Sequence, residues 1–472
     1  MTFSFKFSLI AAAIALAGCA SVSPDGGAAD LNTQILGKTA GVAAQVAVAD
    51  TADTRAAVAK LLSAPISAES AVRIALLNNP GLHASLATLG ISDADRAQAG
   101  SLPNPHFSIG RFVEGDKLEI ERALKFNIIG LLSLPWRAKW QSQQHELAKL
   151  NAAQEVIKLA ADTRKAWINA VAAQQTAAYM ANAKLAAEAS GELARRLARV
   201  GNFSRLTQAR EQVFLADAAT QLAKSQQAAF AEREKLVRLM GLWGAQTQFT
   251  LVERLPDIPK MPQDIQNIEE RALRDRLDVR SSVAESGYVA DALGLVKASG
   301  FINALELGYK SSSTLDNTSG TSETKRGWEL ELPLPLFDWG SASNARAQAV
   351  YMQSVAKVRQ TAINARSEAR EAYHGYRTAY DVAVHYRDEV VPLRKFISDE
   401  VLLRYNGMLL SVFDLLSDMR AQIMAVNGAI EAQRDFWLAD ADLQTTLTGT
   451  AAGALSGMRA GASAGSEAKA AH

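Results

Sequence analysis

The chain has a single cysteine, few aromatic residues and no excess charge of either sign. The lone cysteine, Cys19, excludes an internal disulfide and argues against a thiolate metal site. Aromatic residues make up 7% of the 472 residues, and 50 basic side chains nearly cancel 49 acidic ones. A net charge of +1 gives no general attraction to nucleic acid, so no nucleic-acid partner is expected. Alanine is abundant instead, and small side chains allow long helices to pack closely.

The polar residues form no recognisable catalytic or metal-binding pattern. The chain has six histidines, but no HxxxH or CxxC spacing occurs. His374 and His385 are about three helical turns apart, too far to share an ion. No serine stands in the context of a nucleophile elbow. The sequence therefore predicts no enzyme, no cofactor and no resident metal, and a hydrolase is the weakest functional alternative.

The N-terminus is typical of a bacterial targeting segment. Lys6 precedes an apolar run at 7–16 that is too short to cross a membrane as a helix. The sequence LAGC at 16–19 resembles the lipobox of bacterial lipoproteins, which implies a signal peptide at 1–18 and acylation of Cys19. By the same resemblance, Ala20 in place of an aspartate favours the outer membrane. A signal peptide with a chance cysteine is the alternative.

Two stretches of the chain repeat one plan. In each, a helix leads to a pair of alternating segments, and these lead to two long helices separated by a glycine-containing break. We predict a mainly α protein with a small β part, built as a duplicated half-molecule. The predicted parts are an extended tether at 19–66, a first repeat at 67–242 with strands at 104–135, a linker at 243–267, a second repeat at 268–449 with strands at 301–336, and a disordered tail at 450–472.

The strands alternate in character and the helices are unusually long. Trp328, Leu330 and Leu332 alternate with Glu329 and Glu331, a pattern typical of transmembrane barrel strands and equally of half-buried sheets. Residues 138–199 contain no proline, so they predict a helix of about 90 Å at about 1.5 Å per residue. The corresponding helix at 340–404 contains Pro392, where we predict a kink.

Strand number predicts association. Membrane-spanning barrels begin at about 8 strands, and an open sheet edge is not tolerated in lipid. Two copies with two strands each provide only four strands per chain. We therefore expect a homotrimer, in which three chains of four strands close a twelve-stranded β-barrel that continues into an α-helical barrel.

Several short motifs, in this order and in duplicate, resemble the TolC family of outer-membrane efflux proteins. The resemblance spans about residues 67–449 and includes the two glycine breaks, ALLNNP at 75–80, LPNP at 102–105, LPLPLFDWG at 332–340 and NAR at 344–346. It implies a trimeric, lipid-anchored exit duct in the outer membrane of a Gram-negative bacterium, extending into the periplasm. The implied partners are outer-membrane lipid, a periplasmic adaptor protein and an inner-membrane efflux pump, which supplies the energy.

The same resemblance assigns roles to the glycine breaks. It places the periplasmic gate at Tyr405 and Asp414, with hydrogen bonds from neighbours such as Tyr405 expected to hold Asp414. A second acidic gate position falls on Ser417, with Asp418 beside it. The adaptor-docking tips would be Gly201, Asn202, Ser204, Gly407, Met408 and Ser411.

The second tip departs from the family pattern. The family's tip glycine falls on Met408, with Gly407 one place early, and a basic position falls on Leu410. The tips at 201–202 and 406–410 resemble those of metal-associated members, which favours metal cations as cargo. Met408, Met419 and Met424 could pass Cu(I), although helix packing is the more favoured interpretation.

Two further alternatives stay open. A structural coiled-coil envelope lipoprotein without a pore would also contain long helices, but it would not need a strand pair before each helix pair. The tryptophans near the strands fit either an interfacial aromatic belt or simple packing at strand ends. They are Trp136, Trp328 and Trp339.

Overall fold

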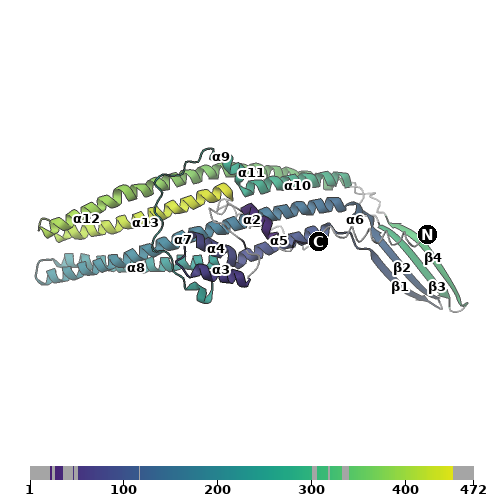
Figure 1. Cartoon of the computed structure of the whole chain (residues 1–472), viewed down its shortest axis with the longest axis horizontal. Helices are drawn as coiled ribbons and strands as arrows, with labels where there is room; N and C mark the ends of the chain where they lie inside the picture. Colours follow the sequence, from purple (N-terminus) through teal and green to yellow (C-terminus); the bar gives the residue numbers. More distant parts are fainter. Residues whose placement is uncertain are drawn as a thin grey trace. The chain divides into compact units, whose positions relative to one another are not determined.

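The fold consists of long helices and one small sheet, arranged in two compact units (Figure 1). The computed structural model describes residues 22–23, 27–35, 46, 51–115, 117–299, 306–316, 319–331 and 340–449. Unit 1 comprises Met1–Gly27, Leu86–Asn151 and Arg280–Thr361, and unit 2 comprises Ala28–Ser85, Ala152–Val279 and Ala362–His472. Cys19, Leu332, Trp339 and the predicted tail lie outside the described residues.

Unit 1 contains a four-stranded antiparallel sheet in the order β1-β2-β3-β4. Its strands are β1 (His106–Glu114), β2 (Lys117–Asn127), β3 (Glu306–Asp316) and β4 (Thr321–Glu331). Each predicted strand pair forms a hairpin, and β2 pairs with β3 to join the two hairpins. The sheet therefore combines strands from both repeats, while β1 and β4 form its edges.

Cross-strand register separates the two faces of the sheet. Phe107 lies opposite Leu124, which lies opposite Tyr309, which lies opposite Trp328. The other face carries ion pairs, in which Lys125 contacts Glu331 at 3.3 Å and Lys310 contacts Glu121 at 3.1 Å. The apolar and polar faces predicted from the alternation are thus present, because side chains of a strand point alternately to opposite sides.

The predicted long helices are confirmed. The helix α7 runs without interruption through 66 residues, and α8 and α13 follow the two glycine breaks. The helices are α2 (Ala28–Ile35), α3 (Ala52–Leu62), α4 (Ala68–Asn78), α5 (Pro80–Ala99), α6 (Ile128–Leu132), α7 (Leu134–Arg199), α8 (Arg205–Met240), α9 (Ile268–Asp275), α10 (Leu277–Ser299), α11 (Ser341–His385), α12 (Val391–Asn406) and α13 (Val412–Thr448).

The structure corrects three details of the sequence prediction. The predicted extended tether contains α2 and α3, and the latter starts with a capping box at Thr51. The first strand pair ends at Asn127 rather than at 135, because Asn127 caps α6. The interruption expected at Pro392 begins earlier, as a π-helix at Tyr386–Val390, and the proline occupies the first turn of α12, where its missing N–H costs nothing.

Unit 2 contains two clusters of buried apolar side chains. Trp167 of α7 is 3% exposed and packs within one cluster, where its indole N–H donates to the Ile66 carbonyl at 2.8 Å. Tyr376 and Phe436 belong to a second cluster, with ring centroids 5.7 Å apart. Buried aromatic side chains of this size hold α7, α11 and α13 in place with large contact areas.

Candidate functional site

The first helix hairpin ends in a turn that requires glycine. After α7, Gly201 has φ +80, a left-handed conformation that side chains with a Cβ rarely adopt. The backbone N–H of Asn202 then donates to the Leu197 carbonyl at 2.9 Å, which satisfies the end of the helix. Ser204 begins the returning helix α8, since its side chain accepts from the Thr207 N–H at 3.1 Å. The tip is therefore a well-defined turn.

The second hairpin turns at Met408 rather than at a glycine. Met408 has φ 58, whereas the preceding Gly407 has φ −81. The family's tip glycine position, which the sequence places on Met408, is thus the position that needs the left-handed backbone. Met408 adopts this conformation with its side chain 94% exposed, so no packing within the chain offsets the strain.

Asp414 is held by Ser411, and this corrects one detail of the predicted gate. The two residues form a capping box, in which the Ser411 N–H donates to the Asp414 carboxylate at 3.0 Å and the Ser411 hydroxyl at 2.7 Å. These bonds, the hydroxyl first, lower the pKa of Asp414. Among the described residues, no hydrogen bond joins the Tyr405 hydroxyl to Asp414. Tyr405 and Asp418 are both half-buried.

The two hairpins contact each other near their ends. Phe203 of the first tip stacks on Phe413 of the second, with centroids 5.0 Å apart and planes 15° from parallel. Deeper along the hairpins, Arg420 of α13 donates to the carboxylate of Glu211 of α8 at 2.8 Å. Ser190 of α7 donates to the same buried carboxylate, also at 2.8 Å. No sequence motif marks these partners, which lie far apart in the chain.

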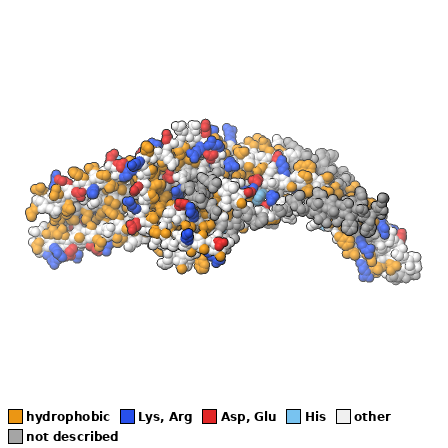
Figure 2. Space-filling model, in the orientation of Figure 1, with side chains coloured by type: hydrophobic (Ala, Val, Ile, Leu, Met, Phe, Trp, Pro, Cys, Tyr) orange, Lys and Arg blue, Asp and Glu red, His pale blue; other side chains and the backbone are white. Residues whose placement is uncertain are grey.

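Exposed apolar side chains surround both tips (Figure 2). The most exposed ones near the turns are Val200, Leu206, Leu403, Met408 and Leu409. Met424 is 71% exposed, so neither it nor Met408 packs between helices of this chain. Two arginines near the tips pair within their own helices: Arg404 with Glu400 at 2.7 Å and Arg199 with Glu192 at 3.9 Å. These ends have an apolar surface that a partner could cover.

The sheet also exposes its apolar face. Phe107 and Ile109 are each 66% exposed, and Trp328 is 74% exposed. The apolar character continues beyond the strands, through Leu132 of α6 at 61% and Trp136 of α7 at 53%. Within the described part of the chain, no helix is both long and apolar enough to cross a bilayer.

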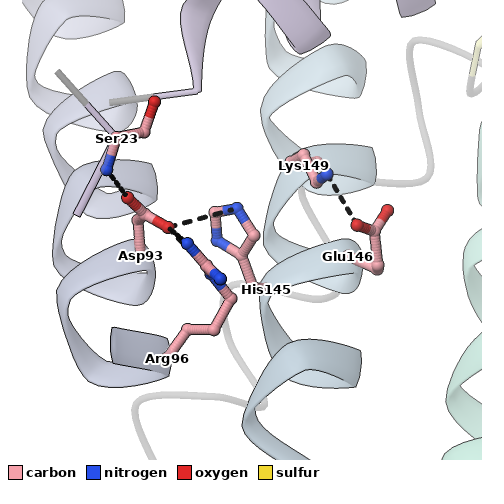
Figure 3. Close-up of polar contacts among 6 residues, drawn as sticks. All are labelled: Ser23, Asp93, Arg96, His145, Glu146 and Lys149. Carbon is pink, nitrogen blue, oxygen red and sulfur yellow. Dashed lines mark hydrogen bonds and ion pairs between the residues drawn. The ribbon is translucent and has the colours of Figure 1, made fainter. Parts of the chain in front are cut away.

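A polar cluster in unit 1 binds the backbone of Ser23 (Figure 3). The buried carboxylate of Asp93 accepts from the Ser23 N–H at 2.6 Å and from Arg96 at 2.7 Å. Burial raises the pKa of Asp93, but these donors outweigh it and hold the pKa below its usual value. His145 lies 3.9 Å from the same carboxylate, and burial followed by the nearby Lys149 ammonium lowers its pKa.

Acidic and metal-binding side chains do not gather elsewhere in the described ranges. No group of three or more His, Cys, Asp or Glu side chains in those ranges could hold a metal ion.

Comparisons with known proteins identify the fold. No family model matches the sequence, and no curated protein matches it either. Solved structures of outer-membrane channels do match. CusC, described in terms of conformational changes accompanying folding and transmembrane channel formation, is 15% identical with a TM-score of 0.65, over 81% of this chain and 92% of CusC.

Two further channels match equally well. The Campylobacter jejuni CmeC outer-membrane channel is 16% identical with a TM-score of 0.65, over 80% of this chain and 85% of its own. The Neisseria gonorrhoeae MtrE outer-membrane channel, in its open state, is 17% identical with a TM-score of 0.65, over 81% and 89% of the two chains. The chain therefore has the fold of the TolC-family outer-membrane channels, as its sequence predicted.

Proposed function

We propose that the chain is the outer-membrane exit duct of a tripartite efflux system, a passive channel and not an enzyme. The observation that carries this proposal is the four-stranded sheet, whose apolar face is exposed and whose edges β1 and β4 are open. In water the apolar face of such a sheet would be exposed to solvent. In lipid the backbone N–H and C=O groups at its edges would have no hydrogen-bond partner. The fold shared with outer-membrane channels supports the same function.

Association of three chains resolves both problems. Three chains of four strands form a ring of twelve, in which β1 of one chain pairs with β4 of the next. The exposed apolar face then contacts lipid, and the charged face with its ion pairs lines the interior. The long hairpins extend into the periplasm, where an adaptor protein and an inner-membrane pump supply the substrate.

Mass and conductance test this proposal together. The purified protein in detergent should show three times the monomer mass by native mass spectrometry. In planar bilayers the same preparation should conduct ions in discrete steps. A stable monomer with its full β-content would contradict the duct and favour a coiled-coil lipoprotein without a pore.

The second hairpin forms the gate in this proposal, with Tyr405, Asp414 and Asp418 as its residues. The bonds from Ser411 hold the pKa of Asp414 below its usual value, so its carboxylate is ionised at neutral pH. Three such carboxylates around a narrow opening attract cations. Asp414→Asn should reduce cation selectivity, whereas Ser411→Ala, which loosens the helix start but leaves the charge, should increase conductance and preserve selectivity. Equal selectivity in Asp414→Asn and wild type removes Asp414 from the gate.

The exposed tips form the adaptor-docking surface in the same proposal. Their turns are defined by Gly201, Asn202 and Ser204 in the first hairpin and by Gly407, Met408 and Ser411 in the second. The apolar side chains around these turns fit the contact surface of another helical protein. Leu409→Glu should weaken adaptor binding while the channel still conducts.

Metal cations are the proposed cargo. The ionised Asp414 and the exposed thioethers of Met408 and Met424 are ligands that a passing soft cation could contact. Deletion of the gene should sensitise cells to copper or zinc salts, and complementation should reverse the effect. Sensitivity to organic compounds alone would assign a different cargo.

The lipid anchor at Cys19 is also proposed. Ser23, four residues later, is bound to the buried Asp93, so the segment that would carry the acyl chains starts from a fixed point on unit 1. Metabolic labelling with a clickable palmitate should mark the wild type and not Cys19→Ser. Labelling of the serine variant would place the acyl group elsewhere.

A further inference from the structure

One row of the sheet interrupts the exposed apolar face with arginines. Ile109 of β1 lies opposite Arg122 of β2, which lies opposite Ser311 of β3, which lies opposite Arg326 of β4. The next row toward the hairpin turns begins with Arg111 of β1. By strand alternation, all three arginines point to the side that carries Phe107 and Trp328. They are exposed, as is Ile109, whereas Ile120 opposite Arg111 is half-buried.

The register places the three arginines close together on the exposed face. Arg111 and Arg122 are diagonal neighbours on adjacent strands, which places their Cα atoms about 7–8 Å apart. Arg122 and Arg326 are separated by one strand, or about 10 Å. The hydroxyl groups of Ser313 and Thr324 lie on the same face, 3.3 Å apart. We call this set the arginine row.

The basic residues on the two faces differ in their partners. On the polar face, Lys125 and Lys310 pair with Glu331 and Glu121. Among the described residues, no carboxylate lies within ion-pair distance of any arginine of the row. Every acidic side chain of the four strands belongs to the opposite face, since the register places Glu114, Glu119, Glu121, Glu306, Asp316, Glu323, Glu329 and Glu331 there. Like charges that lie so close together favour an external anion.

The arginine row marks a boundary on the exposed face. Toward the helices, the face is apolar through Leu124 and Phe126 and continues to Leu132 and Trp136. Toward the hairpin turns, β4 is polar at every residue of Thr321–Arg326, whereas the same face of β1, β2 and β3 still carries Val113, Leu118 and Leu315. Arginine is unfavourable in the middle of a bilayer but not near its surface, where it meets lipid headgroups. The row therefore lies where the continuous apolar face first gives way to a mixed face, with the polar residues on β4.

We propose that the arginine row binds the phosphate groups of anionic lipid in the outer leaflet of the membrane. The proposal rests on the proposed function, which directs the helices to the periplasm and the hairpin turns to the exterior. In that orientation the row lies at the outer headgroup level. Guanidinium groups bind phosphate in a bidentate manner, and the neighbouring hydroxyls add further donors. The phosphorylated glycolipid of the outer leaflet has the matching chemistry, and it fixes the depth of the sheet.

The test uses the full-length protein in detergent, titrated with bisphosphorylated lipid A and with its dephosphorylated form. Native mass spectrometry reports the lipid bound per trimer. The test variant is the triple Arg111→Gln, Arg122→Gln, Arg326→Gln. The matched control is the triple Lys117→Gln, Lys310→Gln, Lys325→Gln, which removes the same charge from the other face.

The wild type should bind the phosphorylated lipid at least about tenfold more tightly than the dephosphorylated one. The arginine triple should weaken that binding about a hundredfold, at about fivefold per arginine, and the lysine triple should change it less than about threefold. If the arginine triple does not fold, the single variants Arg326→Gln and Lys325→Gln repeat the comparison. Arg326→Gln should weaken binding of the phosphorylated lipid about fivefold, and Lys325→Gln should leave it unchanged.

Two results would overturn the proposal. If the wild-type trimer conducts but binds both lipids equally, the arginine row is not a phosphate site, and the proposed duct is unaffected. If both triple variants lose affinity equally, the attraction is general charge and not a site. A wild type that forms no conducting trimer would instead contradict the duct itself, and the inference with it.

Discussion

At the scale of single residues, Met408 stands out because it occupies a backbone conformation suited to glycine. Its φ of 58 places it in the left-handed region, and only Asn267 shares this feature among the described non-glycine residues. The left-handed region costs an ordinary residue about 1–2 kcal/mol. Its side chain is almost fully exposed, so no packing of that side chain within the chain offsets the strain. It does place an apolar side chain at the outermost point of the second tip.

Substitutions at the two tips test this backbone strain. Met408→Gly should stabilise the second hairpin end locally by about 1 kcal/mol, because glycine tolerates the left-handed backbone. Gly201→Ala should destabilise the first tip by a similar amount, because Gly201 has φ +80. Amide hydrogen exchange of the two turns measures both effects. Gly407→Ala is the control and should change little, since its φ is −81; slower exchange in that variant would contradict the assignment.

His145 makes the stability of unit 1 dependent on pH. Burial, followed by Lys149, holds the pKa of folded His145 below 6.5. As the pH falls through 6.5, His145 is therefore protonated in the unfolded chain before it is protonated in the folded one. The free energy of unfolding should therefore decrease as the pH falls below 6.5 and level off below the folded pKa. Asp93, Arg96 and Glu146 face the same ring, but the pKa of Asp93 lies below 3.8, outside this window.

The melting temperature in detergent, measured between about pH 7.5 and about pH 5.5, tests this dependence. The wild type should lose stability across the range, whereas His145→Gln should show a flatter profile. His83→Gln is the control, because its ring contacts a backbone carbonyl, at 3.2 Å from the Leu77 oxygen, and no carboxylate. Identical profiles for wild type and His145→Gln would assign the dependence to other groups.

At the scale of secondary-structure elements, a buried arginine connects α10 and α11 in unit 2. Arg276 is 1% exposed and contacts Asp278 at 2.6 Å and Glu368 at 2.8 Å. Arg276→Met should destabilise the protein by about 2–3 kcal/mol, because it leaves two carboxylates without their shared cation. Arg274→Met, whose native side chain is 75% exposed, should cost less than about 0.5 kcal/mol. Thermal unfolding compares the two; equal losses would show that the buried ion pairs contribute nothing.

Most of the elements could be predicted from local sequence, because their signals are local. Alternation in β1 to β4 and the absence of proline from most of α7 each specify a backbone conformation without reference to the rest of the chain. The helix α3 was missed because its alanines and threonines lack a clear apolar period. The π-helix at Tyr386–Val390 has no signal in the local sequence, and the packing at it is distant: the Tyr386 ring occupies the space where a Cβ of Gly428 of α13 would lie.

The candidate site also contains features that local sequence could predict and features that it could not. The Ser411–Asp414 capping box has a recognisable spacing and could have been read from the sequence, whereas a family resemblance led to Tyr405 instead. The stacking of Phe203 on Phe413 and the pairing of Arg420 with Glu211 join residues about two hundred positions apart. Contacts of this kind depend on how the hairpins pack, and no local pattern specifies them.

At the scale of the whole molecule, the open sheet predicts a difference between the single chain and its assembly. In one chain, the outward N–H groups of β1 and β4 have no strand partner, whereas β2 and β3 are paired on both sides. In the proposed trimer, all strands are paired on both sides. Amide hydrogen exchange of the assembled protein should therefore protect β1 and β4 as strongly as β2 and β3. Rapid exchange confined to the two edge strands would mean that the ring is not closed.

The π-helix has a consequence for symmetry. The helix α7 is uninterrupted, whereas its counterpart in the second repeat contains the π-helix between α11 and α12. Each backbone hydrogen bond of a π-helix spans one residue more than in an α-helix, so the side chains after it are turned around the axis relative to an uninterrupted α-helix. The proposed trimer would therefore present hairpins of two kinds in alternation, and its ring would have threefold rather than sixfold symmetry. An adaptor protein present in six identical copies would then meet two different kinds of binding site. Each copy would have to bind in one of two ways.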